Sequence, residues 1–141
     1  MPNLSGTTAA LGVGDGVELA TEPTQWDVQN TPAAATQATA SKAAVANMRH
    51  VCKSISASIA AGATAQTPIR LVLRDGATGA GTIRWSKKLS APVNGLATID
   101  VTGLAIVGSV NTAMTLEFAA AGVAASEQDV FLGGIDITGG L

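Results

Sequence analysis

Apolar and polar residues alternate along most of the chain beyond residue 36. In the segment 50–59 the odd positions are mostly apolar, and Lys53 is the one residue out of phase. The even positions of this segment carry His50 and three serines. The same period of two recurs in residues 69–75, 82–89, 96–101, 110–119 and 129–137. This alternation is typical of β-strands that bury one face.

Glycine-rich turn signals separate these segments. Residues 75–81 open on an Asp-Gly pair and predict a hairpin loop, and Asn94-Gly95 predicts a second turn. In the last segment the apolar phase shifts across Gly133-Gly134, where we expect a β-bulge. No segment reads as a helix long enough for a crossover. We therefore expect an all-β fold, an antiparallel β-sandwich of jelly-roll type with about seven or eight strands, in one domain over residues 34–141.

Residues 1–33 show no sustained period, because glycines interrupt every short apolar run. We expect this segment to be an extended N-terminal arm. It is too apolar for a solvated tail, so it should dock on its own body or on a neighbour. Its candidate partner-binding residues are Leu4, Leu11, Val13, Val17, Leu19 and Trp26.

Composition limits the size of the core. Hydrophobic residues make up 47% of the 141 residues, but 27 of them are alanine. Val, Ile, Leu and Phe number 33 together, which suffices for one compact domain and not for two. Because some of these residues lie in the arm, we expect an isolated monomer to be marginally stable and to gain stability by association.

Charge is segregated along the chain although the net charge is only −2. Residues 1–30 hold four acids and no base, and residues 100–141 hold five acids and no base. All eight Lys and Arg lie in residues 42–88, where Asp75 is the single acid. Two arrangements would balance these charges: acidic strands beside basic strands within one molecule, or an acidic arm of one copy on the basic strands of another.

The sequence offers no catalytic, metal-binding or cofactor-binding motif. His50 is the single histidine, has no G-x-S-x-G serine to act with, and is expected on the surface among serines. With Cys52 it could supply two metal ligands, but no further Cys or His completes a site. The glycine-rich stretches lack the G-K-[ST] of nucleotide loops. We therefore predict no enzymatic activity and no cofactor.

Membrane and nucleic-acid partners are not expected either. The chain has no apolar run of 18 residues and no signal-peptide pattern at its start, and one cysteine cannot form an internal disulfide. The overall charge is acidic, and no aromatic side chain is expected on the outward positions to stack bases. These features indicate a protein made in a reducing cytoplasm.

One surface cluster stands out. Two consecutive strands joined by the hairpin loop 75–81 carry alternating basic residues, which should share one sheet face. This basic sheet face consists of Arg70, Arg74, Arg84 and Lys88. Four like charges repel one another, so we expect an acidic protein surface as partner, either the chain's own arm or another protein; a solvated positive face is the alternative.

The chain resembles a family of small phage structural proteins, the cement or decoration proteins of tailed phage heads. The resemblance covers roughly residues 30–137 and is carried by "RHV", "AQTPI", "LRDGATGAG" and "GSVNTAMTLEFAAAGVAASEQDV". It implies a jelly-roll protein that forms homodimers on the outer surface of an icosahedral shell. It also implies the major capsid protein as partner, and it carries over no catalytic or binding residue.

These observations lead to one functional hypothesis and one alternative. The hypothesis is a non-enzymatic virion protein that clamps neighbouring capsid proteins against the pressure of the packaged DNA, assembled in the bacterial cytoplasm. The alternative is a receptor- or carbohydrate-binding β-sandwich of a phage tail. Sugar sites present exposed aromatic side chains, and only Trp26 and Trp85 are available, with Trp85 in the inward phase.

Overall fold

The computed structural model describes residues 24–139, which form nine β-strands. Within this stretch there is no helix, and hence none that could span a membrane. The strands are β1 (Thr24–Asn30), β2 (Thr39–Lys42), β3 (Met48–Ala60), β4 (Gln66–Asp75), β5 (Thr82–Ala91), β6 (Leu96–Val101), β7 (Ile106–Val107), β8 (Met114–Phe118) and β9 (Glu127–Thr138).

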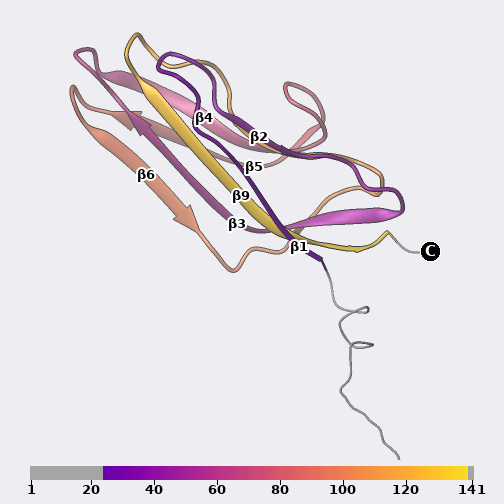
Figure 1. The fold of residues 1–141 in the computed structure, drawn as a ribbon. Helices are drawn as coiled ribbons and strands as arrows, with labels where there is room; N and C mark the ends of the chain where they lie inside the picture. The colour runs from indigo at the N-terminus through magenta and orange to yellow at the C-terminus, as the bar shows by residue number, and fades with distance from the viewer. Residues whose placement is uncertain (1–23, 140–141) are drawn as a thin grey trace, which may run out of the picture.

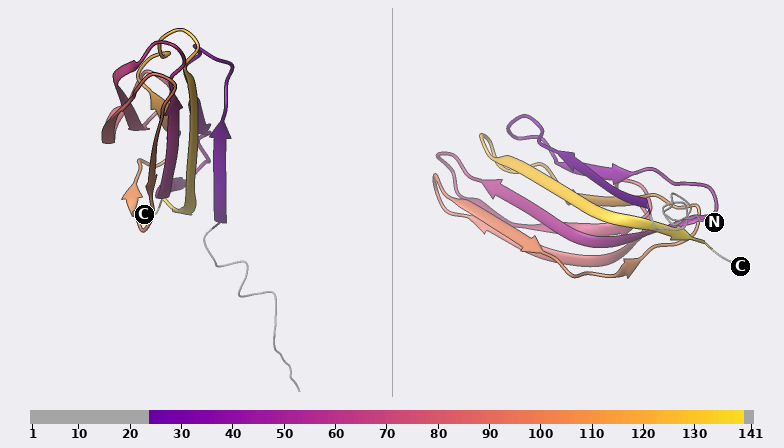
Figure 2. Two further views of the ribbon diagram at one scale, coloured as in Figure 1. Left: turned by 90° about the vertical axis from the view of Figure 1, so that its left-hand side faces the viewer. Right: turned by 60° about the horizontal axis from the view of Figure 1, so that its bottom comes forward.

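The strands form two sheets that lie face to face (Figures 1 and 2). Sheet A has the order β1-β9-β3-β6, with β7 also paired to β3, and sheet B has the order β2-β8-β4-β5. Every pair is antiparallel. The predicted all-β antiparallel sandwich is confirmed. The jelly-roll type stays a prediction, and the pairs are nested as it requires: β4 with β5, then β3 with β6, β2 with β8, and β1 with β9.

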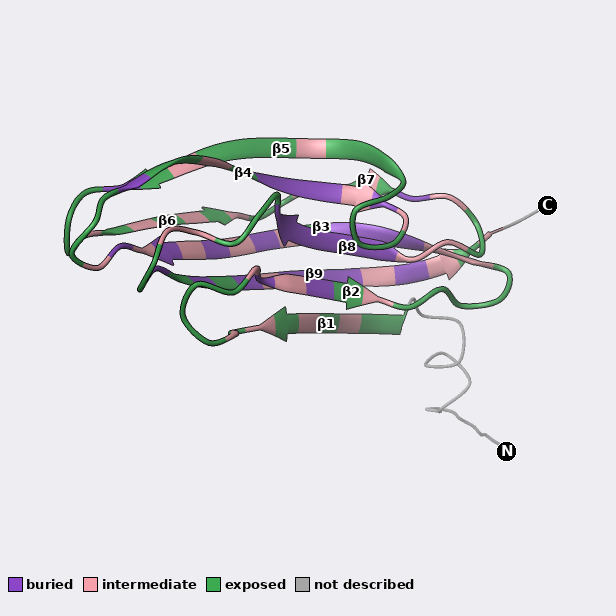
Figure 3. Ribbon diagram, turned by 90° about the horizontal axis from the view of Figure 1, so that it is seen from above, coloured by how far each residue is buried: buried purple, intermediate pink, exposed green. Residues whose placement is uncertain are grey.

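The core lies between the sheets and is built from the inward positions of the alternating strands (Figure 3). Aliphatic side chains of β3, β4, β8 and β9 form its centre, with Phe118 as its largest fully buried residue. Small residues complete it: Ala38, Ala40, Cys52 and Ala57 are all buried in the same cluster. The alanine-rich composition therefore contributes to the core, because small side chains let the two sheets pack closely.

A β-bulge reverses the phase of β3. Cys52 pairs with Gly134 and Ser54 with Gly133, so Lys53 is the extra residue. Strand β9 keeps an unbroken register against β1 across the same two glycines. The predicted bulge therefore exists at this level of sheet A, but it lies in β3 and not in β9. In the sequence, Lys53 indicated this bulge, because it is the one residue out of phase in the alternation of β3. Its side chain is exposed.

The predicted boundary of the arm at residue 33 is wrong. Residues 24–30 are strand β1, which pairs along its whole length with β9 at the edge of sheet A. Its inward residues Trp26 and Val28 pack against the core. Residues 1–23 lie outside the described residues, and with them Leu4, Leu11, Val13, Val17 and Leu19.

Candidate interaction surfaces

Trp26 holds β1 to the sandwich. Its Nε1 donates a hydrogen bond to Asp136 Oδ1 over 2.7 Å, and its ring meets the His50 ring edge-on with centroids 5.5 Å apart. Gly134 lies opposite Trp26 in the strand pair and leaves room for the indole. Lys42 Nζ lies 5.8 Å from the centroid of the ring, within reach of a cation–π interaction. Trp26 is thus an anchor of the domain and not an arm residue that reaches a partner.

His50 is buried, which corrects the expectation of a surface histidine. The bulge at Lys53 turns His50 toward the interior, where its side chain is 1% exposed. Its Nε2 donates to the carbonyl oxygen of Ala43 over 2.9 Å, and its Nδ1 lies 2.5 Å from Asp136 Oδ1. Both ring nitrogens are therefore occupied by protein oxygens. His50 therefore links β3, β9 and the loop before β3.

Only half of the predicted basic sheet face is a free positive surface. Arg70 and Lys88 are directly opposite each other on β4 and β5, both exposed, as the alternation predicts. Arg74 instead pairs with Glu117, with Nε 2.6 Å from Oε2. A second register shift, between Leu73 and Arg74, leaves Arg84 without a direct partner on β4. The expectation that all four basic residues share one free face is wrong.

The hairpin loop between β4 and β5 covers the outer face of β8. Gly79 N donates to Glu117 Oε2 over 3.0 Å, and Thr115 Oγ1 donates to the carbonyl oxygen of Gly76 over 2.8 Å. Glu117 and Thr115 are consequently buried although they face away from the core. The loop therefore covers the Glu117 carboxylate of the Arg74–Glu117 ion pair and removes the pair from any partner surface.

Asp75 forms an ion pair with Arg84, so Arg84 does not contribute a free positive charge to the basic sheet face. Arg84 Nη2 lies 2.8 Å from Asp75 Oδ2, and Ser109 donates to the same carboxylate from its backbone N (2.9 Å) and its Oγ (2.7 Å). Burial by itself would raise the pKa of Asp75. The hydrogen bonds from Ser109 and Arg84, together with the Arg84 charge, outweigh burial and hold that pKa below its usual value.

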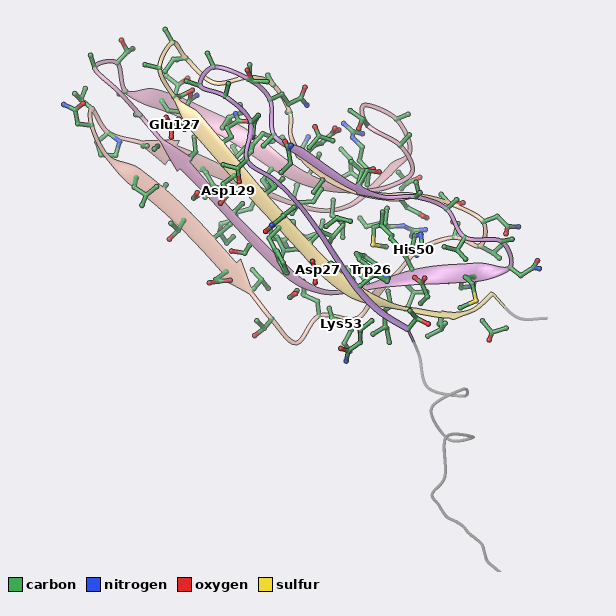
Figure 4. All side chains as sticks on the ribbon, in the orientation of Figure 1. Trp26, Asp27, His50, Lys53, Glu127 and Asp129 are labelled. Carbon is green, nitrogen blue, oxygen red and sulfur yellow. The ribbon has the colours of Figure 1, made fainter. Side chains whose placement is uncertain are left out.

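Sheet A carries an acidic face. Its outer side presents four exposed acids on β1, β6 and β9, three of which are labelled in Figure 4: Asp27, Asp100, Glu127 and Asp129. Among residues 24–139 the ion pairs are His50–Asp136, Arg74–Glu117 and Arg84–Asp75, so none uses these four acids. The charge segregation of the sequence is thus balanced partly by buried pairs within the molecule and partly left on two opposite faces.

A shallow groove of about 570 Å³ crosses the outer side of sheet A. Its floor contains Gly133, where the lack of a side chain leaves a dip, and Phe131 contributes aromatic surface. Asp27 and Lys53 add one negative and one positive charge to its lining. The mixed lining could hold a polar ligand or a peptide side chain. It contains neither a histidine nor a cysteine, and so none of the usual nucleophile–base pairs.

Cys52 has the environment of a core residue. Burial raises the pKa of its thiol to about 11, although a contact with the carbonyl oxygen of Ser54 partly offsets this. Residues 24–139 contain no group of three or more His, Cys, Asp or Glu side chains placed to hold a metal ion.

Sequence reasoning missed the buried acids Asp75, Glu117 and Asp136, and the acidic face as a surface. For Glu117 a signal was present, since an acid in the outward phase of a strand that neighbours an Arg-bearing strand is a natural ion-pair partner. For the acidic face the signal was the surplus of acids at both ends of the chain. The partner of His50 could not be found in this way, because Asp136 lies 86 positions away.

Comparisons with known proteins add little. No protein-family model matches the chain, and no curated protein matches it. A solved structure described as "Bacillus endospore appendages form a novel family of disulfide-linked pili" aligns with 83% of this chain and 90% of that one, at 19% identity and a TM-score of 0.32. A similarity this distant carries no functional argument.

Proposed function

We propose that this chain is a non-enzymatic structural protein, a cement protein on the outer surface of a tailed phage head. In this role it binds as a homodimer and joins neighbouring copies of the major capsid protein. The observation that carries the proposal is the separation of exposed charge: an acidic face on the outer side of sheet A, and exposed Arg70 and Lys88 on the outer side of sheet B. A small sandwich with two unlike faces can contact two different protein surfaces at once.

The polar interior supports a structural role. The buried His50, Asp75, Glu117 and Asp136 are each engaged by other groups of the same chain. Such pairs stabilise the fold and leave no activated group beside the groove. A shell offers many equivalent sites, so a protein of this size could reinforce it through many modest contacts.

The proposal is tested by the copy number of the protein on purified DNA-filled heads. We expect it to co-purify with heads in numbers comparable to the major capsid protein, and heads stripped of it to release DNA at lower temperature. Adding the purified protein back should restore the higher temperature. A few copies per particle, or release of DNA that does not change on stripping, would contradict a cement function.

The groove on sheet A favours one second candidate, a carbohydrate- or receptor-binding module of a phage tail. Phe131 offers aromatic surface, and Asp27 and Gln25 offer hydrogen-bonding groups of the kind that orient sugars. Binding to a glycan array that is lost in Phe131→Ala would support this candidate. If the protein bound no glycan on the array, the carbohydrate-binding candidate would be contradicted.

A further inference from the structure

Three basic side chains at one edge of the sandwich have no acidic partner within residues 24–139. They are Arg70 on β4 and Lys87 and Lys88 on β5, all exposed. Arg70 Nη2 donates only to the neutral Ser86 Oγ, over 3.1 Å. Arg70 and Lys88 are directly opposite each other, so their charges repel. An acidic group brought to this edge would relieve that repulsion.

Strand β5 is also open along one side. It pairs with β4, and no other described strand pairs with it, so half of its backbone N–H and C=O groups face outward. A ten-residue edge strand of this kind can accept an added strand. Its lysines discourage pairing with the identical edge of another copy, because like charges would meet. They favour an added strand that is acidic.

The chain itself contains such a strand-forming sequence. Residues 1–23 hold Asp15, Glu18 and Glu22 and no base. In the stretch 17–22, "VELATE", Glu18 and Glu22 are both at even positions. In an extended strand their side chains would therefore lie on the same side. Residues 17–22 join β1 through Pro23 alone, so fully extended they reach roughly 23 Å from Thr24. The free edge of β5 in the second molecule must therefore lie beside the start of β1.

The geometry favours a second copy over the molecule's own β5. The segment continues from β1, which is the edge of sheet A that packs against β2, whereas β5 is the far edge of sheet B, beside β6 (Figure 3). Symmetry favours residues 1–23 of a second copy, rather than the acidic face of sheet A, as the partner of the free β5 edge. An acidic face on a basic face is a head-to-tail contact, which gives a ring or a filament, whereas two reciprocally exchanged segments close a two-fold dimer.

We propose that residues 17–22 of one copy add to the free edge of β5 in a second copy, with Glu18 or Glu22 beside Lys88. The exchange is reciprocal and holds the dimer together. The inference rests on the homodimer of the proposed function, but it concerns the isolated protein and needs no phage head.

Two charge-reversal variants of the full chain test the exchange. One is Glu18→Lys/Glu22→Lys, and the other is Lys87→Glu/Lys88→Glu. We expect the wild type to be a dimer by sedimentation equilibrium, and each variant to dissociate about tenfold or more readily, because like charges then meet. Lys53→Glu, an exposed lysine on sheet A, is the control and should leave the dimer unchanged. Unchanged thermal unfolding of each variant shows that the fold is intact.

Mixing the two variants decides between exchange and self-contact. In the mixture each segment meets a β5 edge of opposite charge, so a heterodimer should form with near wild-type affinity. A carbodiimide should then join a carboxylate of residues 17–22 in one copy to Lys87 or Lys88 of the other. Failure of the mixture to dimerise, or dimers that persist in both variants alone, would overturn the inference. If the exchange holds but the protein does not bind heads, the cement function fails and this inference stands.

Discussion

Arg74 and Glu117 form an ion pair on the outward side of sheet B in which the carboxylate is nevertheless buried. Arg74 Nε lies 2.6 Å from Glu117 Oε2, and the side chains are 17% and 1% exposed. The loop after β4 covers the Glu117 carboxylate, and Gly79 N in this loop donates a hydrogen bond to Glu117 Oε2. The same contact thus fixes the loop, joins β4 to β8 and removes one positive charge from the surface.

We predict that Glu117→Gln destabilises the protein by about 2–3 kcal/mol, at the lower edge of the range for breaking a buried ion pair, because Arg74 can partly rehydrate. The amide keeps the shape and can still accept from Arg74, while its NH₂ takes the place of Oε1, which has no hydrogen-bond partner among residues 24–139. The loss of stability in Glu117→Gln therefore measures the contribution of the negative charge of Glu117. Urea unfolding monitored by circular dichroism measures it.

Arg84→Gln is the matched control for this substitution. It breaks the ion pair with Asp75, but the Arg84 side chain is 41% exposed, and pairs of this kind contribute about 1 kcal/mol or less. A loss for Arg84→Gln as large as that for Glu117→Gln would show that burial beneath the loop is not what gives the Arg74–Glu117 pair its strength.

Asp75 should contribute to the acid sensitivity of the fold. Its pKa is held below the usual value by Ser109 and Arg84 acting against burial, so the folded state favours the ionised carboxylate. The stabilisation is complete above the pKa of the unfolded chain, about 3.9, and is lost as pH falls through the lower pKa of the folded state. We expect Asp75→Asn to be less stable than wild type at pH 7.

The difference between wild type and Asp75→Asn should shrink as pH falls below about 4, because the wild-type carboxyl is then protonated as well. Chemical denaturation at a series of pH values from 7 to 2.5 provides the measurement. Ser109→Ala removes one donor to the same carboxylate and should show a smaller difference of the same sign. A difference that stays constant over this range would mean that ionisation of Asp75 is not linked to folding.

Cys52 should be unreactive in the folded protein. Its thiol is fully buried, and burial raises its pKa to about 11, so little thiolate exists at pH 8. We expect Ellman's reagent to modify it only in denaturant, with a rate that follows the unfolded fraction. Ser56→Cys, at a partly exposed position of the same strand, should react within the folded protein. Prompt labelling of wild-type Cys52 without denaturant would contradict the packing described for β3.

Local alternation was enough to predict the longer strands, because the apolar positions of β3, β4, β5, β6 and β9 recur on one face. In β8 the residue types alternate as well, although the structure buries both of its faces. Strand β1 escaped prediction since its sequence, TQWDVQN, is mostly polar. Trp26 and Val28 do alternate with polar residues, but two apolar positions are too few to distinguish a strand from an irregular segment, and the register with β9, 100 to 112 positions away, is what makes it one. The four-residue β2 is too short to show a period.

The surfaces were harder to predict than the strands because one inserted residue reverses a face. Lys53 turns His50 from the outward to the inward phase, and the register shift beside Arg74 separates Arg84 from its expected neighbours. Arg70 and Lys88 lie on the regular part of the β4–β5 pair, where alternation holds, and they are the two members of the basic face that have no acidic partner among residues 24–139.

The glycine pair in β9 offers a comparison between adjacent positions. A methyl group on Gly134 would press on the carbonyl oxygen of Val51 and lie 2.7 Å from Trp26 Cζ2, and neither β3 nor the packed indole can yield. On Gly133 it would lie 2.7 Å from Ser54 Oγ, which can rotate away. We expect Gly134→Ala to cost about 1–3 kcal/mol and Gly133→Ala less than about 1 kcal/mol. Urea midpoints at unchanged m-value measure both, and equal shifts would contradict the close packing of Trp26 over Gly134.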